Sequence, residues 1–346
     1  MRELLYTPLS WLYGLAVNFR HRLFDWGVLK SEQFDIPIIC ICNITVGGTG
    51  KTPMAEMLIS FLKRKHCVAL LSRGYGRRTK GYREVPIDAH YRDVGDEPLQ
   101  IKRKIPDTTV VVCEKRVEGI RRLREEHPEV NLIVMDDGFQ HRYVQPKINV
   151  LMVDSTRPIQ SDKMLPAGTL RDNPEQLYGA HYFVVTKCPE KMAPIDRRIL
   201  RKVLVKYAYQ RIYFTRFETF SPQPLFPKEE LRPLKQRGKV IALSGIGNPK
   251  PFLSTLNEQY RVVEEVTLKD HHVYRVRDML HLEELLKRHP DAAIITTEKD
   301  AVKMGRAEKI PATVRRSLYY MPIDITFIEE SATDFLQKIE EDVRSN

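Results

Sequence analysis

The residues best suited to chemistry form a glycine-rich run that ends in a lysine and a threonine. Its members are Thr45, Val46, Gly47, Gly48, Thr49, Gly50, Lys51 and Thr52. A nucleoside triphosphate needs backbone N–H groups near its phosphates, a lysine on the terminal phosphates and a hydroxyl group for Mg²⁺. The glycines, Lys51 and Thr52 supply these groups in that order. The run therefore predicts a phosphate-binding P-loop for ATP, although Thr45 stands where the usual pattern has glycine. A chance glycine-rich turn is the alternative.

Two adjacent carboxylates, Asp136 and Asp137, follow an apolar run at residues 132–135. An acid at the C-terminal end of a buried strand holds the metal ion or its water shell in P-loop proteins. We therefore expect Thr52, Asp136 and Asp137 to bind Mg²⁺, with a strand-ending Asp-Gly turn as the alternative. Together with the glycine-rich run, these acids indicate phosphate chemistry or nucleotide-driven switching, and they do not separate the two.

Several polar residues are candidates for binding or activating a phosphate acceptor. Arg73, Tyr75 and Arg77 follow a predicted strand and should lie at the carboxyl edge of the sheet, where ligands bind in such folds. Asp96 lies in a turn. It is a candidate general base for a hydroxyl nucleophile, and the alternative is that it caps a helix. Arg171 follows a Pro/Gly bend, where it clamps phosphate or is simply surface charge.

Two motifs in the last third of the chain have open roles. His271 and His272 follow Asp270, and they either bind a metal, share a proton or cap the next helix. The run at residues 296–300 follows an apolar stretch and is either a base-recognition turn or a structural bend.

These residues must be positioned by short apolar runs that alternate with helix-like stretches. The runs are residues 36–42, 67–71, 109–113, 131–135, 149–153 and 182–186. Near-continuous apolar strands of this kind are typical of a parallel sheet with helices on both faces. A Pro-rich, charged stretch near residue 220 is a plausible linker, and a second α/β pattern starts at residue 239. We expect three parts: a helix at 1–30, a P-loop core at 31–218 and a smaller lobe at 219–346, with a cleft between the lobes.

The N-terminal segment has an apolar stripe at helical spacing. Leu12, Leu15, Ala16, Phe19, Leu23 and Trp26 form it. Asn18, His21 and Asp25 lie opposite, and Arg20 and Arg22 flank the stripe. This pattern favours a helix lying in a membrane interface or a helix that packs on the protein. The longest uncharged run is too short to span a bilayer, and no export signal is visible.

Composition limits the classes of function. The 346 residues fit one large α/β domain or two, and the net charge of +11 points to anionic partners such as phosphorylated substrates or an acidic membrane. Nucleic acid is not expected, because the basic residues are dispersed and no aromatic stacking motif appears. The five cysteines show no zinc-type pairing and indicate thiols in a reducing compartment.

The motifs together resemble those of the tetraacyldisaccharide 4′-kinase (lipid A 4′-kinase) family. The resemblance covers nearly the whole chain, in the family's order. It runs through residues 43–53, 72–76, 95–98, 136–141, 165–168, 270–272 and 297–303. Cys42 departs from the family, which commonly has glycine there.

The resemblance implies a specific activity. The family transfers the γ-phosphate of ATP, with Mg²⁺, to the 4′-hydroxyl of a tetraacylated glucosamine disaccharide 1-phosphate, giving lipid IVA at the cytoplasmic face of the inner membrane. It implies that Asp96 is the catalytic base, helped by His271, that Lys51 acts on the phosphates, and that Arg116 and Arg171 suit phosphate contacts. It also favours the membrane-interface interpretation of the N-terminal helix. A membrane-associated ATPase or nucleotide switch remains the alternative.

Overall fold

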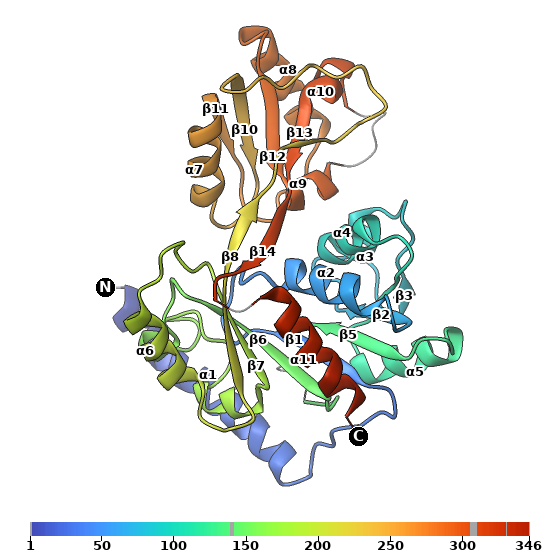
Figure 1. Cartoon of the computed structure of the whole chain (residues 1–346), viewed down its shortest axis with the longest axis vertical. Helices are drawn as coiled ribbons and strands as arrows, with labels where there is room; N and C mark the ends of the chain where they lie inside the picture. The colour runs from blue at the N-terminus through green and yellow to red at the C-terminus, as the bar shows by residue number, and fades with distance from the viewer. Residues whose placement is uncertain (1, 139–141, 305–309, 330, 346) are drawn as a thin grey trace.

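Two α/β lobes joined by a pair of long strands make up the computed structural model, which describes residues 2–138, 142–304, 310–329 and 331–345 (Figure 1). The strands that join the lobes are β8 (Arg211–Thr219) and β14 (Ile323–Phe327), which pair antiparallel. The predicted α/β class with a mostly parallel sheet is confirmed.

The larger lobe is built on a nine-stranded sheet in the order β14-β8-β7-β6-β1-β5-β2-β4-β3. Among the described strands of this sheet, β3 and β14 alone pair antiparallel. The central strands are apolar and buried because helices cover both faces. The remaining strands are β1 (Ile38–Cys42), β2 (Val68–Ser72), β3 (Arg83–Glu84), β4 (Thr109–Val112), β5 (Leu132–Asp136), β6 (Ile148–Asp154) and β7 (Tyr182–Thr186).

Helices cover the two faces of this sheet through separate apolar clusters. On one face pack α2 (Lys51–Leu62), α4 (Asp96–Lys104) and α11 (Ala332–Arg344). On the other face pack α5 (Arg116–Glu126) and α6 (Pro194–Leu204). The short helices are α3 (Tyr91–Val94) and the 3₁₀ segments η1 (Ile159–Ser161) and η2 (Pro174–Gly179).

The smaller lobe has a five-stranded sheet in the order β11-β10-β12-β13-β9. Its strands are β9 (Gln223–Pro224), β10 (Lys239–Ser244), β11 (Arg261–Thr267), β12 (Ala293–Thr297) and β13 (Leu318–Met321). Its helices are α7 (Lys250–Gln259), α8 (Val276–Arg288), α9 (Glu298–Lys303) and α10 (Ala312–Ser317).

The C-terminal segment returns to the larger lobe, which corrects the expected boundary of 219–346. After β13 the chain forms β14 beside β8, and α11 then buries Phe335, Leu336 and Ile339 in the core of the larger lobe. The smaller lobe therefore occupies roughly residues 220–322. The spacing of apolar residues in a helix does not specify which sheet the helix covers, so the sequence did not reveal this return.

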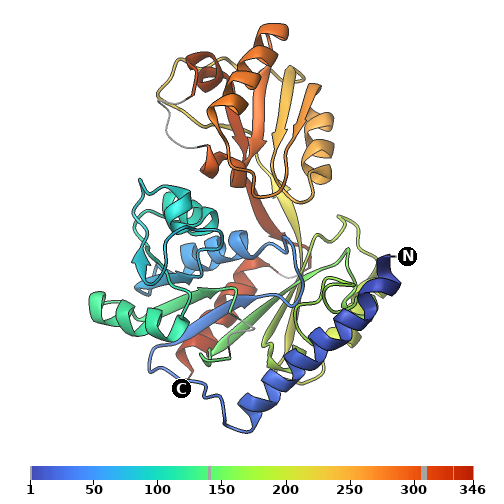
Figure 2. The same ribbon diagram turned by 180° about the vertical axis from the view of Figure 1, so that it is seen from behind.

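The N-terminal helix α1 (Arg2–Asp25) runs along the larger lobe (Figure 2). Its more polar side faces the protein. Ser10, His21 and Phe24 are buried, whereas Leu12, Leu15 and Phe19 are 63%, 64% and 58% exposed. The helix thus turns an apolar face to solvent, the reverse of an ordinary surface helix. Among the described residues, no helix combines the length and apolar character needed to cross a bilayer.

Candidate active site

The glycine-rich loop leads from β1 into α2, at the centre of the larger sheet. Gly50 has a φ of 89°, and a Cβ atom at this position would lie 2.6 Å from Cζ of Phe217, so only glycine fits. Among the residues that the structure describes, no side chain caps the first turn of α2, and no acidic residue lies in that turn. Its backbone N–H groups are therefore available to an anion, as the predicted P-loop requires.

A buried asparagine holds two cations at the loop. Nζ of Lys51 donates to Oδ1 of Asn43 at 3.2 Å, and the Arg171 guanidinium donates to the same oxygen at 2.8 Å. The Asn43 amide in turn donates to Oγ1 of Thr49 at 3.0 Å. We did not predict a role for Asn43. Its signal in the sequence was a polar amide directly after a strand that is otherwise apolar.

The two predicted metal ligands lie beside the loop in different electrostatic states. Burial, and then the charge of Glu97, raise the pKa of Asp136 to about 7, and its Oδ1 has no hydrogen-bond partner among the described residues. Burial acts in the same direction on Asp137, but Lys51 and Arg171 outweigh it and lower the pKa of that carboxyl. Asp137 also has a φ of 53°, a conformation that non-glycine residues rarely adopt.

The donor set of Thr52, Asp136 and Asp137 fits Mg²⁺. This ion is commonly held by one or two carboxylates while it keeps several waters. A buried carboxylate oxygen without a partner is the kind of atom that such an ion satisfies. Phe139, Gln140 and His141, which complete the motif, lie outside the described residues.

Asp96 and His271 meet across the cleft between the lobes. Asp96 is buried as the first residue of α4, and its Oδ2 lies 3.6 Å from Nδ1 of His271. Burial alone would raise the pKa of Asp96, but hydrogen bonding to His271 and the charges of Lys299 and Lys303 hold it below its ordinary value. The Asp96 carboxylate is therefore ionised at neutral pH, and the other ring nitrogen of His271, Nε2, lies 3.9 Å from Asp270.

The other residues of the second-lobe motifs separate into structural and cleft-facing ones. Nε2 of His272 lies 3.0 Å from Asp278, which also accepts from the backbone at the start of α8, so His272 supports that helix. Asp300 is fully buried and binds Thr297 and the Gly245 amide. Lys299 instead points to the cleft, 3.7 Å from Glu97.

The predicted acceptor residues are not all brought to the cleft. Tyr75 is exposed, with its ring centroid 5.5 Å from that of His271, and Arg73 is also exposed. Arg77 is corrected: its side chain is 2% exposed and binds Glu114 and the Gly81 carbonyl. Arg116 is also corrected, because it is buried behind the acids and donates to the Cys113 and Asp136 carbonyls. Nothing in their spacing showed that these two cations fold inward.

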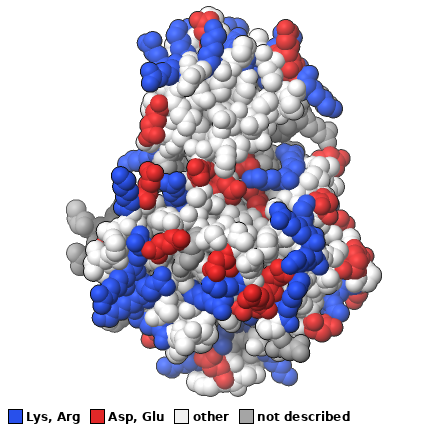
Figure 3. All heavy atoms as spheres, in the orientation of Figure 1, with Lys and Arg blue, Asp and Glu red and all other residues white. Residues whose placement is uncertain are grey.

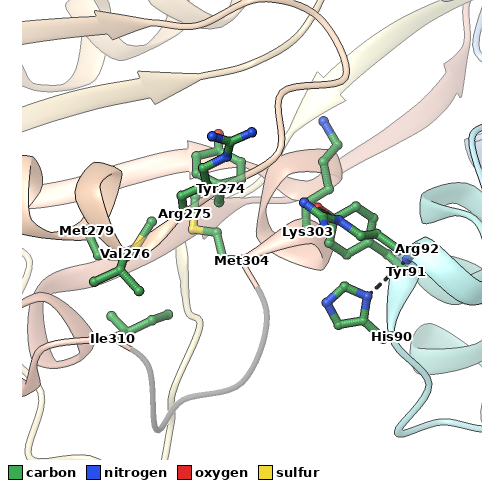
Figure 4. Close-up of a pocket in the computed structure, with 10 residues that line it drawn as sticks. All are labelled: His90, Tyr91, Arg92, Tyr274, Arg275, Val276, Met279, Lys303, Met304 and Ile310. Carbon is green, nitrogen blue, oxygen red and sulfur yellow. Dashed lines mark hydrogen bonds between the residues drawn. The ribbon is translucent and has the colours of Figure 1, made fainter.

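A cavity of about 400 Å³ opens between the lobes (Figure 4). Its polar lining includes His90, Tyr91 and Arg92 from the larger lobe and Tyr274, Arg275 and Lys303 from the smaller one. Lys303, which lines this cavity, is also one of the two lysines that lower the pKa of Asp96. The cleft expected from the two-lobe pattern is therefore present and carries several cations.

Comparison with known proteins identifies the family. The family model described as tetraacyldisaccharide-1-P 4′-kinase matches residues 2–342. A tetraacyldisaccharide 4′-kinase of Phocaeicola vulgatus is 39% identical over 98% of this chain and 94% of that protein. A second one, of Flavobacterium johnsoniae, is 35% identical over 99% of this chain and 98% of that protein.

A solved structure has the same fold. The "apo" form of LpxK from Aquifex aeolicus, crystallised in complex with ATP, matches with a TM-score of 0.74 and 24% identity, covering 99% of this chain and 100% of that one. This chain has the glycine-rich loop, the Asp136–Asp137 pair and the Asp96–His271 contact. Both relatives named above match it over nearly their full length and are tetraacyldisaccharide 4′-kinases. The chain belongs to the tetraacyldisaccharide-1-P 4′-kinase family.

Proposed function

We propose that this protein transfers the γ-phosphate of ATP to the 4′-hydroxyl of tetraacyldisaccharide 1-phosphate, the step of lipid A biosynthesis that forms lipid IVA. Membership of the kinase family supports the reaction. The observation that carries the assignment of roles is the Asp96–His271 contact at 3.6 Å. A nucleotide switch or a simple ATPase needs no acceptor base outside its phosphate-binding loop.

On the donor side, the loop residues 45–52 hold the phosphates of ATP. The free N–H groups at the start of α2 point at them, and Lys51 places its ammonium group on the terminal phosphates. Asn43 keeps the Lys51 and Arg171 side chains together in the absence of nucleotide. Mg²⁺, held by Thr52, Asp136 and Asp137, neutralises phosphate charge when it is bound.

On the acceptor side, the Asp96 carboxylate accepts the proton of the 4′-hydroxyl. The oxygen then forms a bond to the γ-phosphorus as the bond from that phosphorus to the leaving ADP oxygen breaks. His271 orients Asp96 through its Nδ1 contact. Tyr75 is exposed beside His271, and Arg73, two residues earlier in the chain, is also exposed; these two are our candidates for binding the acceptor.

The acceptor is a lipid, so the enzyme must work at a bilayer surface. The exposed apolar face of α1 and the net charge of +11 support a peripheral position on the cytoplasmic face of the inner membrane. No partner other than the lipid acceptor and the membrane is required by this proposal.

The test is transfer of labelled γ-phosphate from ATP to tetraacyldisaccharide 1-phosphate in detergent micelles, with Mg²⁺ and with EDTA. We expect labelled lipid only with Mg²⁺. Labelled free phosphate without labelled lipid would instead support an ATPase or a switch, and the roles of Asp96 and His271 would lose their basis.

A further inference from the structure

The helix between β7 and β8, α6, has an exposed face that the proposed catalytic site does not use. Ile195 and Ile199 lie one turn apart on this face and are 58% and 52% exposed. Single exposed apolar residues are normal, but two branched side chains on one face of a short helix form a small apolar patch. Leu204, on the opposite side of α6, is buried against the sheet.

Basic side chains surround this patch. Arg198 and Lys202 share the face with the two isoleucines, at i, i+3, i+4 and i+7 spacing, and both are exposed. Within the described part of the chain, neither has an ion-pair partner. Arg197 and Arg201, which point elsewhere, approach Glu329 to 2.7 and 4.0 Å. Figure 3 shows Lys and Arg gathered on the flank that α6 occupies.

Helix α1, which has the other exposed apolar face, runs along the same side of the larger lobe as α6. Figures 1 and 2 place both helices on this side of the larger lobe. A Cβ atom at Gly14 of α1 would lie 3.9 Å from the Met164 side chain, and Met164 packs against the same apolar cluster that contains Leu204 of α6. Both helices therefore lie against the same face of the larger sheet.

Two tyrosines extend the patch beyond the C-terminal end of α6. Tyr207 and Tyr209 are half exposed and stack with ring centroids 5.5 Å apart. The Tyr209 hydroxyl donates to the Tyr178 carbonyl at 2.6 Å, which fixes its ring at the surface. Exposed tyrosines beside apolar and basic residues are typical of segments at the level of lipid headgroups.

We infer that the exposed face of α6, with Tyr207 and Tyr209, is a second contact with an anionic bilayer surface and acts together with α1. The α1 face supplies apolar area, and α6 adds unpaired cations that attract acidic headgroups. A second copy of this chain is a poorer occupant, because two such basic faces repel each other. Two separated contacts would fix the rotation of the kinase on the membrane. The inference rests on the proposed function only for the expectation that the acceptor lies in a bilayer.

The test is co-sedimentation of the full chain, without ATP, with vesicles of phosphatidylcholine alone or mixed with phosphatidylglycerol. Removing one positively charged side chain should weaken binding to the anionic vesicles about fivefold. The double variant Arg198→Gln/Lys202→Gln should therefore bind on the order of twentyfold less tightly. The matched control, Lys287→Gln/Arg288→Gln, removes two exposed charges from α8 in the other lobe and should bind like the wild type. Ile195→Ser/Ile199→Ser should weaken binding to both kinds of vesicle.

Wild-type binding of Arg198→Gln/Lys202→Gln to anionic vesicles would overturn the inference. So would a dimer that Ile195→Ser/Ile199→Ser abolishes while vesicle binding is unchanged, because the face would then belong to a second copy. Transfer in detergent micelles separates this inference from the proposed function. Both α6 variants should phosphorylate micellar substrate at the wild-type rate, whereas failure of the kinase assignment would abolish that reaction in the wild type.

Discussion

At the scale of single residues, the site uses side chains whose neighbours decide their chemical state. Asp96 is buried yet kept ionised by His271 and two lysines, whereas Asp136, which is buried more deeply, has its pKa raised to about 7. His271 and Asp137 both have positive φ angles, at 56° and 53°. Non-glycine residues rarely adopt this conformation, and such strain is concentrated at functional sites.

The base assignment predicts a large loss of rate from a nearly isosteric change. Asp96→Asn keeps the size of the side chain but removes the proton acceptor, so kcat should fall about 10²- to 10⁴-fold. The measurement is transfer of labelled phosphate to the lipid, with thermal melting to check the fold. An Asp96→Asn variant with near wild-type kcat would remove Asp96 from the mechanism.

The two adjacent histidines should respond differently to the same substitution. His271→Ala removes the partner of Asp96 and should lower kcat by about tenfold or more with little change in melting temperature. His272→Ala removes the contact with Asp278 at the start of α8 and should cost about 1 kcal/mol of stability. Equal effects of the two changes on kcat would contradict the separate roles.

At the scale of elements, a polar network connects α2, α4 and α9. Glu56 of α2 accepts from Gln100 at 2.9 Å and from Lys104 at 2.7 Å, both on α4. Lys104 also lies 3.2 Å from Glu298 on α9 of the other lobe. Glu56 is 5% exposed, and burial raises its pKa to about 7 despite Lys104. The network therefore holds a glutamate that is protonated more readily in the folded state than in the unfolded chain.

This raised pKa predicts a pH-dependent stability. Between pH 4.5 and 7 the folded state binds the Glu56 proton and the unfolded chain releases it, so the stabilisation is present at low pH and is lost as pH rises through 7. Glu56→Gln removes this dependence. The unfolding free energy of Glu56→Gln minus that of the wild type should therefore increase by on the order of 1–3 kcal/mol from pH 5 to pH 8.

Urea unfolding at the two pH values measures the effect. The control is Glu284→Gln on α8. Because the Glu284 side chain is exposed, the stability of this variant should depend on pH in the same way as that of the wild type. If the difference in unfolding free energy between Glu56→Gln and wild type were the same at pH 5 and pH 8, Glu56 would be ionised in both the folded and the unfolded state.

At the scale of the whole molecule, catalysis depends on how the two lobes meet. Asp96 belongs to the larger lobe, and His271 and Lys299 belong to the smaller one. The connection runs through β8 and β14, which pair with each other and continue the larger sheet. The state of the base is therefore set partly by the other lobe.

This dependence predicts a shift in the pH–rate profile. The positive charge of Lys299 helps to lower the pKa of Asp96, so Lys299→Met should raise that pKa and move the acid limb of kcat/KM to higher pH. Lys287→Met on α8, far from the cleft, is the control and should leave the limb in place. An unmoved acid limb in Lys299→Met would show that the cleft contact with Lys299 does not form in the working enzyme.

The sequence alone determined the features that depend on nearby residues. Strand, loop and helix around Lys51, the acids after β5 and the apolar stripe of α1 follow from local spacing, because periodicity and glycine content act within a few residues. Burial of Ser10, His21 and Phe24 confirms that one side of α1 packs on the protein, and the membrane-interface interpretation of its exposed apolar side stays a prediction.

Only the tertiary structure decided the features that depend on long-range pairing. It returned β14 and α11 to the larger lobe, turned Arg77 and Arg116 inward, and revealed Asn43 as the shared partner of two cations. It also brought His271 to Asp96 while His272 turned to Asp278. These outcomes depend on which surfaces meet and on which charges lose water, and neither property is encoded in the spacing of a single segment.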